Sequence, residues 1–421
     1  MDTPGNKLLR KRKRAEKRFI GYGILSLMAA FSMLALLLYS IVSTGYTAFQ
    51  KTTLKLEVNL DPEKMSIVAP YTETVLVQGR YSTQVKQALY ALFPGVTDRR
   101  QRRELCKLLS PCAELAVRDF LIDHPDRIGE TVTLEVPMSS DFDQLRKDHL
   151  QRTGENIRFS DDQLQWYDTL DREGLIHTRF NWQFLFGGDS RYPELAGIGG
   201  AVVGSFFALL VCFLLSFPLG IAAATYLEEF APENRLTRII EANINNLAAI
   251  PSVIFGLMGL AIFLNIFGLP RSTPLVGGIV LSLMTLPTII IATRASIRAV
   301  SPGIRQAALA MGASPVQTVF HHVLPVAMPG TLTGTIIGLA QALGETAPLL
   351  MIGMVAFIVN IPTTPVDPSA ALPVQIYLWA ESAERGFVEK NSAAIMVIMA
   401  FLILMNLLAV IIRSRTQTQV E

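Results

Sequence analysis

The chain has 421 residues, of which 50% are hydrophobic and only 17% are charged. Soluble globular proteins carry about 25% charged residues, so this composition argues against a soluble fold and indicates a protein of the lipid bilayer. A formal net charge of +2 provides no basic field of the kind that nucleic-acid-binding proteins use. Five histidines and three cysteines, scattered along the chain, predict no metal site.

The first predicted element is a membrane anchor at residues 20–42. A basic segment, residues 7–18, precedes an uncharged run of 23 residues from Ile20 to Val42. A helix needs about 20 residues to cross the bilayer, whereas the apolar core of a cleaved signal peptide has about 7–15. We therefore predict an uncleaved anchor. Its basic tail, residues 1–19, is expected in the cytoplasm, because basic residues favour that side of the membrane.

Residues 43–194 form a charged, domain-sized block that should lie outside the cytoplasm. Side chains alternate between polar and apolar over Thr52–Val58 and Thr131–Val136, which predicts strands. The stretches Arg102–Leu109 and Ala113–Ile122 read as helices, so we expect a small α+β extracytoplasmic domain. Its two cysteines, at positions 106 and 112, are compatible both with a disulfide in an oxidising compartment and with two free thiols.

Five further uncharged runs follow, each long enough to cross the bilayer. With the anchor they predict six transmembrane helices, so the predicted fold class is all-α transmembrane with the small α+β domain inserted after the first helix. Six crossings return the C-terminal tail, residues 413–421, to the cytoplasm. The five runs of the core, residues 195–412, are expected near 201–223, 247–267, 272–293, 330–358 and 392–412.

The loop between the fourth and fifth spans, residues 294–329, has the pattern of two short capped helices. Ser301-Pro302 and Ser314-Pro315 each place a capping hydroxyl before a proline at the first helical position. Gly312 is a helix stop between them, and Pro325 is expected to end the second helix near Val323. Neither helix is long enough to be stable alone. We therefore predict that the loop docks on another protein.

The spacing of this loop resembles the "EAA" loop of the membrane subunits of ABC importers. Gln306, Ala307 and Ala308, followed by Gly312 and then by Leu324-Pro325, stand at the positions of that motif. The resemblance implies coupling helices that dock on an ATP-hydrolysing subunit. Gln306 stands where the family usually has Glu, and His322 where an aliphatic residue is common.

Three further stretches resemble the membrane permeases of phosphate-specific ABC transporters. They are Pro218–Glu229, Leu247–Leu257 and Leu343–Leu350, and the last is closer to the A-type than to the C-type subunit. The resemblance covers about residues 195–412 and implies the fold of a six-helix type I ABC importer permease. It also implies a C-type permease partner, two ATP-binding subunits and an extracytoplasmic phosphate-binding protein. The block at 43–194 resembles an N-terminal extension of some A-type subunits.

Four residues are candidates for the translocation pathway. Glu345, followed by Thr346, interrupts the fifth run, and a carboxylate at bilayer depth is a functional candidate. The alternative is a structural ion pair between helices. Relatives carry an Arg one turn before this Glu, but here Gln341 stands there. Arg294 and Arg298 could attract anions at the inner end of the fourth run, or they could simply anchor the topology.

No nucleotide-binding loop of the form Gly-x-x-x-x-Gly-Lys-Ser/Thr occurs, so the chain is not expected to be an enzyme. It should bind no cofactor itself, because ATP–Mg is expected to bind to the partner subunit. The sequence thus predicts a multi-pass phosphate permease of the bacterial inner membrane with both termini in the cytoplasm. Two alternatives remain. One is a permease for sulfate, molybdate or tungstate. The other is a membrane sensor. A sensor would need a signalling domain in the cytoplasm, and the nine residues after Ile412 leave little room for one.

Overall fold

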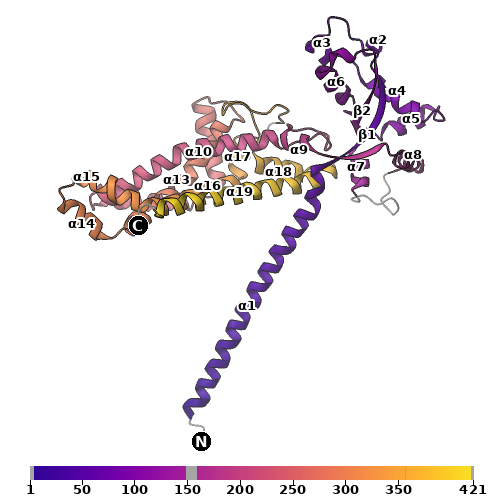
Figure 1. Ribbon diagram of the computed structural model, residues 1–421. Helices are drawn as coiled ribbons and strands as arrows, with labels where there is room; N and C mark the ends of the chain where they lie inside the picture. Colours follow the sequence, from indigo (N-terminus) through magenta and orange to yellow (C-terminus); the bar gives the residue numbers. More distant parts are fainter. Residues whose placement is uncertain (1–3, 148–158, 356, 419–421) are drawn as a thin grey trace.

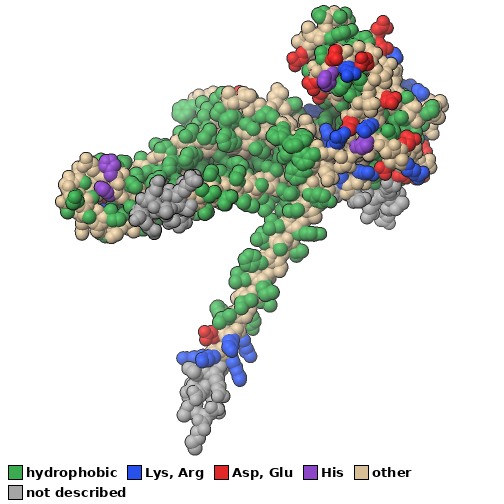
Figure 2. Space-filling model, viewed as in Figure 1, with side chains coloured by type: hydrophobic (Ala, Val, Ile, Leu, Met, Phe, Trp, Pro, Cys, Tyr) green, Lys and Arg blue, Asp and Glu red, His purple; other side chains and the backbone are tan. Residues whose placement is uncertain are grey.

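The computed structural model describes residues 4–147, 159–355 and 357–418. Figure 1 shows a long N-terminal helix, a small domain built on a sheet, and an elongated bundle of helices. We call the second part the sheet domain (residues 50–186) and the third the helical core (residues 199–418). Apolar side chains cover the core and line the long helix, whereas charged side chains gather on the sheet domain (Figure 2). The predicted fold class is confirmed.

The sheet domain contains a three-stranded antiparallel sheet in the order β2-β1-β3. Its central strand carries a buried row of Leu54, Leu56 and Val58, as the period of two requires. The two predicted strands are confirmed, and a third, at residues 176–180, was not predicted. The strands are β1 (Gln50–Asn59), β2 (Thr131–Pro137) and β3 (Ile176–Phe180).

Short helices surround this sheet. One of them nearly matches the helix predicted at residues 113–122, and another overlaps the helix predicted at 102–109 but begins and ends three residues earlier. The thiols of Cys106 and Cys112 are both free, and that of Cys106 lies 3.2 Å from the Tyr90 hydroxyl. The elements are α2 (Pro62–Met65), α3 (Glu73–Val77), α4 (Ser82–Leu92), α5 (Arg99–Cys106), α6 (Glu114–Asp123), α7 (Ser140–Arg146), α8 (Asp161–Arg172), α9 (Trp182–Phe186), η1 (Tyr46–Phe49) and η2 (Pro125–Arg127).

The long helix α1 (Pro4–Gly45) includes both the predicted anchor and most of the basic segment that was expected to be a tail. Its apolar stretch has no buried residue, and it extends away from the core (Figure 1). Contact with the core is confined to its last turns. There Gly45 lies against α19 (Gly386–Thr418), and a Cβ at this glycine would be 2.8 Å from the Ala393 nitrogen.

The helical core is built around α10, α13 and α16, which pack side by side. Small residues allow close approach, as expected for helices in lipid; a Cβ at Gly220 would lie 2.6 Å from Ile289 Cγ2. With α19, the elements are α10 (Gly199–Thr225), η3 (Tyr226–Phe230), α11 (Arg235–Ala248), α12 (Ser252–Met258), η4 (Gly259–Ile266), α13 (Pro274–Arg298), α14 (Pro302–Ala310), α15 (Pro315–Thr318), η5 (Val319–Val323), α16 (Leu324–Gly344), α17 (Ala347–Met351) and α18 (Leu372–Ala380).

Within the described residues, five helices are long and apolar enough to cross a membrane, or six if one bent pair counts as a single span. That pair corrects the third predicted span, residues 247–267, which is not one straight helix. The chain bends by 102° between α11 and α12. The break lies at Pro251, which has no N–H to donate and disfavours helical geometry at the residue before it.

The fifth predicted span, residues 330–358, is wrong at both ends. The helix begins earlier and runs from Pro315 to Gly344 without a break. The chain then leaves helical geometry at Glu345, where the backbone is extended, and resumes at α17. Apolar residues predominate both before this break, over residues 330–344, and after it, over residues 347–358, so the composition of the segment did not reveal it.

Buried charged side chains fix the sheet domain to the helical core. The Lys147 ammonium, with 3% of its side chain exposed, lies 2.7 Å from Asp143 Oδ2 and 2.9 Å from Glu389 Oε1. Lys390 is also buried and donates to the Ala48 carbonyl at 3.4 Å. Asp143 lies within α7 and Lys147 directly follows that helix, whereas Glu389 and Lys390 belong to the first turns of α19. We call Asp143, Lys147, Glu389 and Lys390 the buried joint.

Candidate functional site

The loop between α13 and α16 folds largely as its caps predict. The Ser301 hydroxyl accepts from the Gly303 N–H at the start of α14. Ser314 forms a full capping box with Gln317 at the start of α15. Between them Gly312 adopts φ +89°, a conformation that only glycine adopts without strain. The sequence therefore fixes a helix, a glycine turn and a second helix start.

The apolar side chains of α14 and of Met311, which follows it, are divided between two environments. Ile304 packs against the apolar cluster at the end of α13, and Ala308 is buried. Gln306 and Ala307 are exposed, and the Met311 side chain is 89% exposed. Further large apolar side chains on this loop are uncovered, namely those of Leu309, Val316 and Phe320. The loop thus presents an apolar surface that the rest of the described chain does not cover.

The second helix of the loop does not end at Leu324-Pro325, which corrects that prediction. Residues 319–323 form a π turn, η5, and the helix continues through Pro325 into α16. A proline inside a helix loses one hydrogen bond and crowds the carbonyl of the preceding turn. A wider π turn immediately before the proline relieves that crowding. The exposed loop is therefore continuous with a helix of the core.

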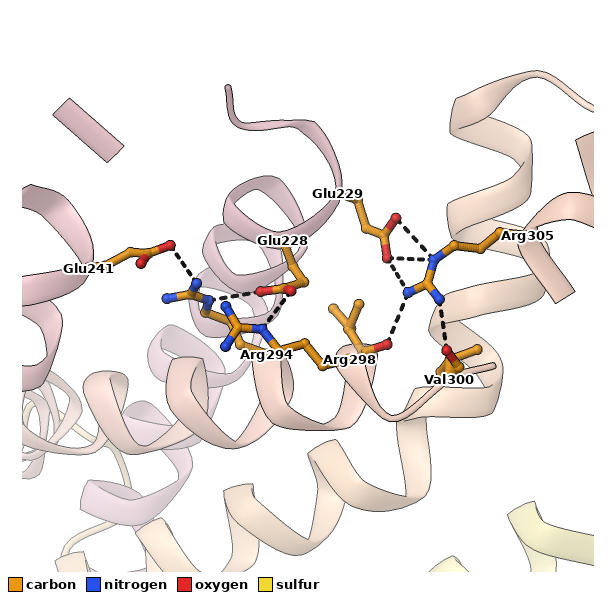
Figure 3. A network of polar contacts seen from close by, with 8 residues as sticks. Glu228, Glu229, Glu241, Arg294, Arg298, Val300 and Arg305 are labelled. Atoms are coloured by element: carbon orange, nitrogen blue, oxygen red, sulfur yellow. Dashed lines mark hydrogen bonds and ion pairs between the residues drawn. The ribbon is translucent and has the colours of Figure 1, made fainter. Parts of the chain in front are cut away.

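An ionic network lies where α10, α11 and α13 meet the loop (Figure 3). Glu228 bridges two arginines: Arg294 Nε at 3.2 Å and Arg298 Nε at 2.6 Å. Arg294 also reaches Glu241 Oε1 of α11 at 2.5 Å. The two arginines predicted for the pathway are thus engaged in ion pairs between helices. Their part in translocation stays a prediction.

Arg305 attaches the loop helix α14 to this network. Its guanidinium lies 2.6 Å from Glu229 Oε1, and it donates to the carbonyls of Val300 at 2.8 Å and Ile297 at 3.0 Å. These carbonyls belong to the end of α13, where helix carbonyls lack partners within the helix. Figure 3 shows how the Arg305 side chain spans the space between η3 and α13.

The acidic partners Glu228, Glu229 and Glu241 were missed as site residues. One sequence feature pointed to them: two adjacent glutamates end an apolar span, while the loop 294–329 holds three arginines and no acid. Neutralising Glu228 with the variant Glu228→Gln should lower the free energy of unfolding by about 1–3 kcal/mol, because it weakens charge-assisted bonds to two arginines.

Thermal unfolding of the purified chain in detergent measures this effect. The matched control is Glu233→Gln, a nearby exposed glutamate with no ion pair in the described chain, for which we expect no measurable shift. Equal melting temperatures for Glu228→Gln and Glu233→Gln would show that the network adds nothing to stability.

The break after α16 places Glu345 and Thr346 between two helix ends. Both side chains are half-buried, and within the described residues the Glu345 carboxylate has no hydrogen bond or ion pair. Gln341, the position one turn earlier, is exposed and supplies no charge. The structural ion pair considered as an alternative is therefore absent from the described chain, and a role for these residues in the pathway stays a prediction.

The two broken spans of the core meet each other. α12, which follows the bend at Pro251, packs on α17, which follows the break at Glu345. The contact is close, because a Cβ at Gly256 would lie 2.6 Å from Pro348 Cα and 3.0 Å from Met351 Cβ. Interrupted helices that meet in this way are a feature of substrate pathways in transporters.

Comparison with known proteins identifies the family. Residues 216–418 match the family described as "Binding-protein-dependent transport system inner membrane component", and residues 6–156 match a domain of unknown function. The probable ABC transporter permease YqgI of Bacillus subtilis is 32% identical over 41% of this chain and 58% of its own length. YqgH of the same organism is 30% identical over 54% of this chain and 74% of its own.

A third relative is the phosphate transport system permease protein PstA 1 of Mycobacterium tuberculosis. It is 30% identical over 52% of this chain and 70% of its own length. The matches thus extend over about half of this chain and, for YqgI, over somewhat more than half of the relative. The matched family region, 216–418, contains the loop helices, the ionic network and both broken spans. The chain belongs to the ABC transporter permeases, the inner membrane components of binding-protein-dependent transport systems.

Proposed function

We propose that this chain is the A-type membrane subunit of an ATP-driven inorganic phosphate importer. The observation that carries this proposal is the loop at residues 301–323, whose exposed apolar surface is continuous with a core helix that ends at Glu345. Such a surface suits a partner protein that pushes on the helix from outside the membrane. The substrate is inferred from relatives that are named phosphate transport permeases.

The proposed complex contains a C-type permease, two ATP-binding subunits that hold ATP–Mg, and a phosphate-binding protein. This chain supplies one half of the translocation pathway. When the two ATP-binding subunits close on each other, it converts their movement into a movement of the two broken spans. In the proposed orientation the loop and both termini face the cytoplasm, and the sheet domain faces the opposite side. Arg294 and Arg298, in this arrangement, hold α13 to η3 through Glu228, and Arg305 holds the loop to the core through Glu229.

Phosphate-stimulated ATPase activity in proteoliposomes tests the proposal. The chain is reconstituted with its permease partner, ATPase and binding protein, and it is compared with Gly312→Asp. At φ +89° a side chain costs of the order of 1–2 kcal/mol and distorts the loop. The matched control is Gly129→Asp, which has φ +90° and open space around it but lies in the sheet domain.

We expect stimulation by phosphate, but not by sulfate or molybdate. It should be lost in Gly312→Asp and kept in Gly129→Asp, with the complex assembled in each case. Stimulation by sulfate or molybdate instead of phosphate would show that another oxyanion is the substrate. The proposed coupling role of the loop would then still stand. An assembled complex that responds to none of these anions would contradict the importer.

A further inference from the structure

The sheet domain contains a cavity of about 620 Å³ between α4, α5 and the start of α7. Cavities of this size are typical of sites for small organic ligands. The cavity lies outside the region matched to the permease family and belongs to the part matched only to a domain of unknown function. It is therefore separate from the loop, the ionic network and the broken spans.

Three cationic side chains line this cavity: Lys86, Arg103 and Lys107. Lys107 is engaged, because its ammonium lies 2.8 Å from Glu104 Oε1. Lys86 and Arg103, by contrast, form no hydrogen bond or ion pair within the described chain. Two cations on neighbouring helices are thus available to one ligand. An arginine guanidinium with a nearby ammonium suits the oxygens of a phosphate group.

The other residues that line the cavity indicate which further chemical groups the ligand carries. The carboxylate of Glu114 lines the same cavity, and it would repel a bare anion but accept hydrogen bonds from hydroxyl or amine groups. Val85, Leu109 and Pro111 add apolar surface suited to carbon atoms. Inorganic phosphate alone would satisfy the cations and leave the Glu114 carboxylate facing negative charge.

We propose that this cavity binds a small phosphate monoester that also carries hydroxyl or amine groups. Its phosphate lies against Lys86 and Arg103, and its hydroxyl or amine groups donate to Glu114.

The cavity adjoins both places where the sheet domain meets the helical core. Asp141 belongs to α7, the helix that carries Asp143 and is directly followed by Lys147 of the buried joint. Ser110, also in the cavity wall, lies close to Glu194, which is just before α10. Burial raises the pKa of this Glu194 carboxyl. An occupied cavity therefore touches the elements that attach the sheet domain to α19 and α10.

Isothermal titration calorimetry of the full chain in lipid nanodiscs tests this site without any transport partner, so its result is independent of the importer proposal. The probes are glycerol 3-phosphate, phosphoethanolamine and glucose 6-phosphate, compared with inorganic phosphate and with glycerol. The variants Arg103→Gln and Lys86→Gln remove the free cations. Arg100→Gln is the matched control, because Arg100 lies on the same helix α5 but does not line the cavity.

We expect at least one ester to bind more tightly than inorganic phosphate, with no binding of glycerol. Each cation variant should weaken that binding at least about tenfold, since each removes a charge-assisted hydrogen bond, while Arg100→Gln should not. Thermal unfolding confirms that the variants are folded. Three outcomes would overturn the proposal: no ester binds at millimolar concentration, inorganic phosphate binds as tightly as the esters, or Arg100→Gln weakens binding as much as Arg103→Gln.

Discussion

Replacing Lys147 with Met should detach the sheet domain from the helical core at a cost of about 3 kcal/mol in stability. The substitution keeps most of the side-chain volume but removes the cation that Asp143 and Glu389 share at 2.7 and 2.9 Å. All three side chains are nearly inaccessible to water, so the carboxylates gain little solvation in return. Breaking a buried pair in this way is far more costly than breaking one on the surface.

Hydrogen exchange of the full chain in nanodiscs locates this effect. We expect faster exchange in α7 and in the first turns of α19, together with a lower melting temperature. The neighbouring variant Arg146→Met is the matched control, because it breaks an ion pair to Asp171 whose two side chains are 37% and 36% exposed. The control should cost less than about 1 kcal/mol. Equal effects of the two variants would mean that the buried joint does not hold the domains together.

Gly256→Ala should reduce transport by at least about tenfold, because it forces apart the two broken spans. The new methyl group would lie 2.6 Å from Pro348 Cα, a backbone atom that cannot rotate away. Overpacking of this kind costs about 1–3 kcal/mol, and here it acts on the contact between α12 and α17. The ATPase would still dock, because the loop at 301–323 is untouched.

Uptake of labelled phosphate by proteoliposomes is the measurement, with ATPase activity followed in parallel. Gly344→Ala is the matched control: it lies at the end of α16, next to the same break, and a Cβ there meets no atom within 4 Å. We expect Gly344→Ala to transport and Gly256→Ala to hydrolyse ATP with little uptake. Normal uptake by Gly256→Ala would show that the close contact of α12 with α17 is not needed.

Local patterns predicted the local structure well. The alternation in residues 52–58 and 131–136 located two strands, and the Ser-Pro pairs with Gly312 located the helices of the loop. β3, only five residues long, offered too short an alternation to recognise. The expected stop at Pro325 failed because the π turn before it absorbs the steric clash, and nothing in the composition of residues 319–323 announces that geometry.

Contacts between distant parts of the chain could not be read from the sequence. Glu228 is paired with arginines 66 and 70 positions away, and Lys147 with a glutamate 242 positions away. Spacing rules describe one helix or one strand, so they cannot choose partners across the fold. Glu345 was found because a charge in an apolar run is conspicuous, whereas the meeting of α12 with α17 depends on two bends that hydropathy averages out.

We expect the uninterrupted helix from Pro315 to Gly344 to act as a mechanical lever. Its 30 residues span about 45 Å at 1.5 Å per residue. A tilt of about 5° around its midpoint therefore displaces each end by about 2 Å in opposite directions. A small push at the loop end is thus delivered at Glu345 with nearly the same amplitude, and the π turn at 319–323 is the point at which such a lever would bend if the push were too great.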